Sequence, residues 1–162
     1  MIVIKKISDA LDAVSKVVAT AMAIALIVIT TFGVIARYVF QSPLEWQNEV
    51  SVLLFAWMIF IGVSMGFKSR EHIMLEFLIH SLPAKAAKLL SVLINLICIA
   101  FLCIVIYAGI DIAKNTWAQM YYTIDLSTAW LYLSFPVNAV VMIVHLIDLT
   151  VDVAINKARA EV

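Results

Sequence analysis

Four long apolar segments, none containing a charged residue, occupy most of this 162-residue chain, at positions 17–36, 50–67, 89–110 and 126–147. An α-helix rises about 1.5 Å per residue, so each segment covers roughly 27–33 Å, close to the ~30 Å hydrocarbon core of a bilayer. With 65% of its residues hydrophobic and 14% charged, the chain has too little polar surface to enclose four such helices in water. The sequence therefore predicts an all-α integral membrane protein with four transmembrane helices.

The basic residues predict how these helices are oriented. Of the eleven Lys and Arg residues, only Arg37 and Lys114 lie in the connections after the first and third segments; the other nine lie on the opposite side. The positive-inside rule then places both termini in the cytoplasm. We expect a single membrane domain over residues 1–162. Its helices are expected at about 15–36, 43–67, 87–111 and 126–149.

The connection between the second and third segments repeats polar side chains every four residues, at Lys68, His72, Glu76 and His80. This spacing predicts an amphipathic helix over about 69–81 on the cytoplasmic membrane surface. The alternative is a cytoplasmic extension of the second helix. The two histidines and the glutamate span about 12 Å of helix, too far to share one metal ion. We therefore predict no metal and no cofactor. The zero net charge and the lack of a basic cluster predict no nucleic-acid partner.

Charged residues gather where the second helix is expected to begin. Glu45 and Glu49 lie one helical turn apart, and Arg37 lies at the same outer boundary. An ion pair between Arg37 and either glutamate would neutralise both groups where water is scarce. The alternative is a carboxylate that couples ions or relays protons. Ser42 and Pro43, followed by Glu45, form a capping-box pattern, which predicts a helix start near residue 43.

Other side chains of the membrane segments suggest packing contacts. Trp46 and Trp57 project to one side of the second helix, where they would contact either lipid or another subunit. Gly62 and Gly66 form a GxxxG motif, which lets two helix backbones approach closely. Interhelical hydrogen bonds are expected for three polar residues inside the apolar segments. These are Asn95, Asn138 and His145.

The residues alone leave two functions open. The sequence contains no nucleophile motif, phosphate-binding loop or haem-type histidine pair, so we predict that the chain is not an enzyme. No acidic residue lies inside an apolar segment, which favours a component of a larger assembly. The alternative is a stand-alone homo-oligomeric four-helix transporter or channel, in which Asn95 and Asn138 would line the path.

A family resemblance narrows this choice. The chain carries the motif R-Y-x-F-x-x-P-L-x-W-x-x-E over residues 37–49 and R-E-H-I at residues 70–73. In these positions it resembles the small membrane subunit of tripartite ATP-independent periplasmic (TRAP) transporters. The resemblance implies a non-catalytic permease subunit of a sodium-driven transporter for organic acids, such as C4-dicarboxylates or sialic acid, in the bacterial inner membrane. It implies that the chain is a scaffold for a large elevator-type membrane subunit and helps to dock a periplasmic binding protein, with membrane lipids around it.

The same resemblance implies roles for single residues. Trp57 would pack along the face of the second helix. The outer loop and the subunit contact would be ordered by Arg37, Glu45, Trp46 and Glu49. At the cytoplasmic membrane surface would lie Arg70 and His72.

Overall fold

The computed structural model describes residues 2–69 and 84–155, and within these ranges the regular elements are four helices. They are α1 (Ile2–Tyr38), α2 (Trp46–Ser69), α4 (Ala84–Asn115) and α5 (Ala129–Ile155). All four are long and apolar enough to cross a membrane, so the expected fold class is confirmed. The orientation of the termini stays a prediction. The amphipathic helix expected over about 69–81, with Arg70 and His72, lies outside the described residues beyond Ser69.

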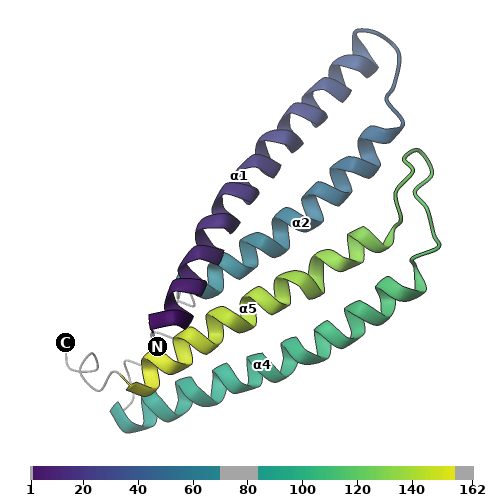
Figure 1. Cartoon of the computed structure of the whole chain (residues 1–162). Coiled ribbons are helices and arrows are strands. Elements are labelled where there is room, and N and C mark those ends of the chain that lie inside the picture. The colour runs from purple at the N-terminus through teal and green to yellow at the C-terminus, as the bar shows by residue number, and fades with distance from the viewer. Residues whose placement is uncertain (1, 70–83, 156–162) are drawn as a thin grey trace.

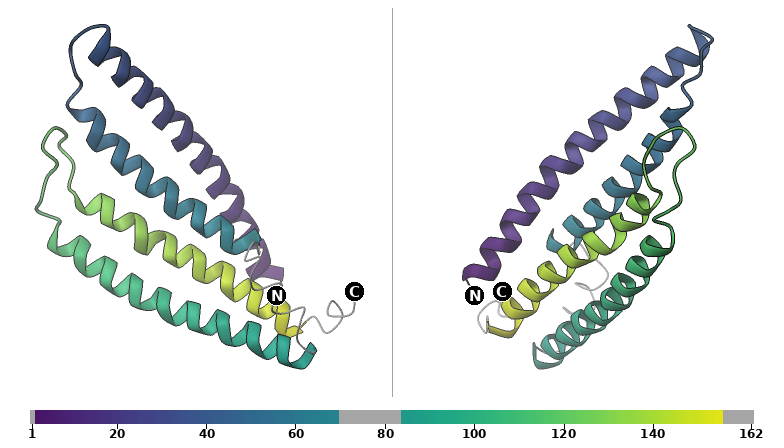
Figure 2. Two further views of the ribbon diagram at one scale, coloured as in Figure 1. Left: turned by 180° about the vertical axis from the view of Figure 1, so that it is seen from behind. Right: turned by 45° about the vertical axis from the view of Figure 1, so that its right-hand side comes forward.

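The helices stand side by side in the order α1, α2, α5, α4 (Figures 1 and 2). α5 packs on each of the other three, whereas α4 contacts α5 alone among the described helices. α1 and α5 converge at the end where α1 begins and α5 finishes, called here the terminal end (Figure 1). They diverge toward the opposite end, called the loop end. The result is an open row instead of a closed four-helix bundle.

α1 is much longer than its apolar segment, because it starts at Ile2 and not near residue 15. The reason is visible in the first turns. Ile4, Ile7, Leu11 and Val14 recur at helical spacing, so the polar stretch can form an amphipathic helix that continues into the span. Lys16 pairs with Asp12 at 2.7 Å, the i,i+4 arrangement that supports a helix.

The start of α2 also differs from the prediction. Residues 42–44 are not helical, and α2 begins at Trp46 instead of near residue 43. Ser42 is engaged elsewhere, because its N–H donates to the carbonyl of Ala36 at 3.1 Å and so closes the end of α1. Gln41 makes this reversal with a φ of 51°, in the left-handed region. The capping-box prediction for Ser42 is therefore wrong.

The main apolar core lies between α4 and α5. Its buried cluster consists of Leu102, Val105, Ala139, Met142 and Leu146. Toward the loop end the two helices approach closely at Gly109, where an added Cβ atom would lie 3.0 Å from Cδ of Pro136. α5 continues through Pro136 as one helix. The absence of a side chain at Gly109 therefore makes room for the proline ring.

Of the three polar residues expected to form interhelical hydrogen bonds, two do so. Asn95 Nδ2 donates to Thr150 Oγ1 at 3.0 Å, between α4 and α5. His145 is bonded to Ser8 of α1 through Nδ1. Asn138 instead donates to the carbonyl of Ser134 in its own helix, at 2.7 Å. The expected interhelical bond is thus confirmed for Asn95 and His145 and wrong for Asn138.

The GxxxG motif makes no close contact between the described helices. A Cβ atom added at Gly62 or Gly66 would meet no atom within 4 Å. α2 instead turns Ile61 and Ser64 inward, and both are buried. Among the described helices, a close contact at a glycine is therefore seen at Gly109 and not at this motif. Packing of Gly62 and Gly66 against a second chain stays a prediction.

Candidate functional site: polar contacts at both ends of the row

At the loop end, Glu49 joins α2 to the connection between α4 and α5. Glu49 lies in the first turn of α2. Its carboxylate accepts the backbone N–H groups of Tyr122 and Thr123 at 2.9 and 3.0 Å, and the Thr123 hydroxyl donates a further short bond. Successive N–H groups that converge on one anion form a nest, a favourable site for a carboxylate. Glu49 thus fixes the position of the loop 116–128.

The predicted ion pair of Arg37 is not formed. Among the described residues, no salt bridge joins Arg37 to Glu45 or Glu49. Both carboxylate oxygens of Glu49 instead accept hydrogen bonds from the loop. Arg37, Glu45 and Trp46 are all exposed at this end of the row. Their role in a subunit contact stays a prediction.

The loop held by Glu49 is itself ordered by backbone hydrogen bonds. Tyr121 N–H donates to the carbonyl of Leu126 at 3.0 Å, and Thr128 N–H donates to Gln119 at 2.8 Å. The Ser127 hydroxyl oxygen accepts the N–H of Ala129 and so caps α5. Burial raises the pKa of the Tyr121 phenol, and the negative charge of Glu49 raises it further. Part of this loop is therefore packed, not fully solvated.

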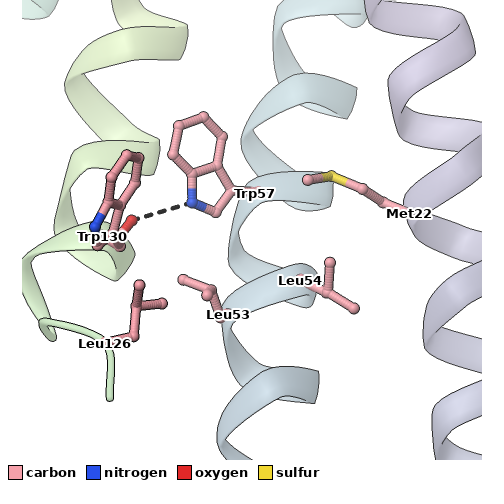
Figure 3. Close-up of a pocket in the computed structure, with 6 residues that line it drawn as sticks. All are labelled: Met22, Leu53, Leu54, Trp57, Leu126 and Trp130. Atoms are coloured by element: carbon pink, nitrogen blue, oxygen red, sulfur yellow. Dashed lines mark hydrogen bonds between the residues drawn. The ribbon is translucent and has the colours of Figure 1, made fainter. Parts of the chain in front are cut away.

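An apolar pocket lies between α1, α2 and the beginning of α5 (Figure 3). Its volume is about 420 Å³, and its lining surface is almost wholly apolar. The lining residues are Met22, Leu53, Leu54, Trp57, Leu126 and Trp130. The Trp57 indole N–H donates to the Trp130 carbonyl at 3.0 Å, which ties α2 to the first turn of α5. Such a lining suits hydrocarbon and offers no charged group to hold an organic acid.

We expect Trp57→Phe to weaken the α2–α5 contact slightly, by less than about 1 kcal/mol, because one hydrogen bond within a membrane protein is worth about that much. The variant keeps an aromatic side chain but loses both the N–H donor to Trp130 and part of the indole ring, so its effect is compared with that of the same change at an exposed tryptophan. Unfolding by SDS in mixed micelles would measure the difference. Trp46→Phe is the matched control, since Trp46 is exposed. Equal stabilities of the two variants would show that the bond contributes nothing.

At the terminal end, five polar side chains from three helices meet. Lys68 of α2 donates to Ser8 Oγ at 2.7 Å, to Asp9 at 2.6 Å and to Asp148 at 3.4 Å. Ser8 Oγ lies 2.9 Å from His145 Nδ1. Ser8 and His145 are fully buried. We call this cluster the charge lock.

Sequence reasoning did not find the charge lock, because α1 was expected to start after Ser8 and Asp9. The missing signal was the helical spacing of the apolar residues before position 16, which places residues 8 and 9 on a helix. Lys68 was assigned to the polar stripe of a surface helix, although it ends the second span. In the two described ranges, no three His, Cys, Asp or Glu side chains are grouped so as to hold a metal ion.

Comparisons with known proteins agree on one family. The model described as "Tripartite ATP-independent periplasmic transporters, DctQ component" matches residues 26–155. The chain is 30% identical over 129 residues to the sialic acid TRAP transporter permease protein SiaT of Haemophilus influenzae strain 86-028NP, covering 77% of this chain and 20% of SiaT. It is 38% identical over 77 residues to the C4-dicarboxylate TRAP transporter small permease protein DctQ of Vibrio cholerae, covering 48% of this chain and 33% of DctQ.

A third relative matches over most of both chains. It is the sialic acid TRAP transporter small permease protein SiaQ of Vibrio cholerae, 23% identical over 140 residues, with 86% of this chain and 81% of SiaQ covered. By contrast, the chain spans only a fifth of the length of SiaT and a third of the length of DctQ. The family consists of transporter permease components and not of enzymes. With four helices able to span a membrane and a family match from residue 26 to residue 155, the chain belongs to the DctQ component family of tripartite ATP-independent periplasmic transporters.

Proposed function

We propose that this chain is the small, non-catalytic permease subunit of a sodium-driven TRAP transporter for an organic acid of the C4-dicarboxylate or sialic-acid type. It lies in the bacterial inner membrane with both termini in the cytoplasm. Its task is to support a large elevator-type membrane subunit and to help dock a periplasmic binding protein. The names of the relatives support the substrate classes, and the distribution of basic residues supports the orientation.

The observation that carries this proposal is the open row of helices. α4 contacts α5 alone among the described helices, so its other side is left uncovered by the described residues. Phe101 and Tyr107 of α4 are 62% and 79% exposed, and Phe32 of α1 is 53% exposed at the other edge. Lipid can cover such surfaces, and a long apolar edge also fits a second membrane subunit. The large part of SiaT outside the alignment is consistent with such a partner.

The loop end supports the docking role. Glu49 holds the loop 116–128 in one conformation by accepting hydrogen bonds from its backbone. Trp117, Met120 and Tyr122 are exposed on this loop. An ordered loop with exposed aromatic side chains loses little conformational entropy when a partner binds. In the proposed orientation this loop faces the periplasm, where a binding protein would approach.

The test combines crosslinking with uptake. A photoreactive amino acid would replace Phe32, Tyr107 or, as a matched control, the buried Leu102, in cells that also contain the candidate large subunit. We expect a crosslink to that subunit from at least one of the two exposed edges and none from Leu102. Uptake of radiolabelled C4-dicarboxylates and sialic acid would be measured with and without this chain, in sodium and in potassium buffers.

Loss of uptake in the absence of this chain, together with an edge crosslink, would support the proposal. Uptake by liposomes that contain this chain alone would overturn it, and so would crosslinks that join only copies of this chain. Uptake that is equally fast in potassium buffer would exclude the sodium coupling and leave the subunit assignment intact.

A further inference from the structure

We propose that the charge lock is what holds the first turns of α1 to the row, so that residues 4–16 form a detachable arm. The proposal concerns the terminal end of the molecule and does not depend on the transported substrate. It assigns a conformational role to Lys68, Ser8, Asp9, His145 and Asp148, which have no part in the proposed function. The arm is bound when the lock is closed and leaves α2 and α5 when the lock opens.

The burial pattern of α1 supports this division. α1 has three buried residues with described side chains, namely Ser8 near its start and Gly33 and Ala36 near its finish. None of the residues from 9 to 32 is buried. The fully buried residues of α1 thus lie at two places, of which only the one at the loop end contains a buried apolar side chain. Between them, α1 contacts α2 through partly buried side chains such as Met22. In the arm, Ile7 is 48% exposed and Val14 is 60% exposed, and Ile4 and Leu11 are only partly buried, so no apolar side chain of residues 4–16 is fully buried.

Hydrogen-bond chemistry shows why Lys68 is the centre of the lock. An ammonium group can only donate, so Ser8 Oγ must accept from it. The Ser8 hydroxyl can then donate its own proton to His145 Nδ1. The lysine, the serine and the imidazole are thus linked by two consecutive hydrogen bonds. Asp9 and Asp148 share the same ammonium from α1 and α5. One cation from α2 therefore binds both of its neighbouring helices at the same point.

The lock fixes the position of the arm, but one of its polar atoms lacks a hydrogen-bond partner among the described residues. His145 Nε2 is buried and has no hydrogen-bond partner among residues 2–69 and 84–155. When Nδ1 accepts from Ser8, Nε2 carries the proton of the neutral ring, and a buried donor without an acceptor destabilises the closed state. Asp9 keeps more than half of its side chain exposed, at 55%, so water can replace its partner. Both features lower the cost of opening, as a detachable arm requires.

The test measures the distance from the arm to α5 in the full chain. Spin labels would be attached at Lys6→Cys and Val140→Cys, both exposed positions outside the lock, in a Cys98→Ala/Cys103→Ala background in lipid nanodiscs. Pulsed electron paramagnetic resonance gives the distribution of distances. We expect one narrow population for the unaltered lock. Lys68→Asp should add a second, longer population, because it places a third carboxylate between Asp9 and Asp148.

Two comparisons separate the lock from general damage. The double variant Asp9→Lys/Lys68→Asp restores an opposite-charge pair and should recover most of the narrow population. Lys16→Asp is the matched control, because it reverses a charge of the same arm that pairs only within α1. If Lys68→Asp does not insert or fold, Ser8→Ala removes the hydroxyl without changing any charge and should give the longer population to a smaller extent. The proposal is overturned if Lys68→Asp, or Ser8→Ala in its place, leaves the distribution unchanged, or if Lys16→Asp broadens it equally.

Discussion

Replacing Gly109 by leucine is expected to force α4 away from α5 and to lower the free energy of unfolding by about 1–3 kcal/mol. At this position even a Cβ atom would lie 3.0, 3.2 and 3.4 Å from three carbons of the Pro136 ring. The ring cannot rotate away, because the proline is part of the α5 backbone. α4 packs on no described helix other than α5. Moving α4 away from α5 would therefore loosen the core around Leu102 and Met142.

Gly62→Leu provides the control for this prediction. It makes the same change in side chain and in helix propensity, but the new Cβ atom would meet nothing within 4 Å. Titration with SDS in mixed micelles, followed by far-UV circular dichroism, would compare the two variants with the unaltered chain. Equal losses of stability, or a loss only in Gly62→Leu, would refute the role given to the Gly109–Pro136 contact.

Glu49→Ala is expected to release the loop 116–128 from α2. The N–H groups of Tyr122 and Thr123 and the Thr123 hydroxyl would lose their common acceptor. Hydrogen exchange at these two amides should accelerate by roughly tenfold or more, because bonds to a charged acceptor are stronger than neutral ones. Exchange in the middle of α2 should stay slow, since the change affects only its first turn.

The nearby Glu45 allows a matched comparison. Glu45→Ala removes the same type of side chain one turn away, but Glu45 is exposed and no hydrogen bond or salt bridge joins it to the described part of the chain. It should leave loop exchange unchanged. A second readout is Tyr121, whose pKa is raised partly by the Glu49 charge and should therefore fall in Glu49→Ala but not in Glu45→Ala. Fast loop exchange in both variants would contradict the assignment.

The apolar segments predicted the number and location of the membrane spans, because hydrophobic length is a local property of the chain. Helix ends were less predictable. Ser42 has a typical capping pattern, yet its N–H closes α1 and α2 starts later, at Trp46. The first turns of α1 were missed because their charges interrupt the apolar segment, although their apolar residues keep helical spacing. The start of α1 was therefore readable from local apolar spacing, whereas the start of α2 depends on a backbone hydrogen bond from Ser42 to Ala36 that the capping pattern does not specify.

Contacts between distant segments were the least predictable part of the site. The position of Glu49 at a helix start suggested Arg37 as its partner, but the acceptor is used by backbone N–H groups that lie 73 and 74 residues further along the chain. No side-chain pattern marks such a partner, since every residue type except proline carries an N–H group. Likewise Gly62 and Gly66 match a packing motif, whereas the close approach occurs at a lone glycine, Gly109, opposite a proline.

The order of the helices has one further geometric consequence. A pore within a single chain needs helices that form a ring, and here the last helix of the row, α4, touches neither α1 nor α2 in the described ranges. An open row of helices does not enclose a pore. Any hydrophilic route for a solute along these four helices must therefore be bounded on its far side by atoms that the helices themselves do not supply.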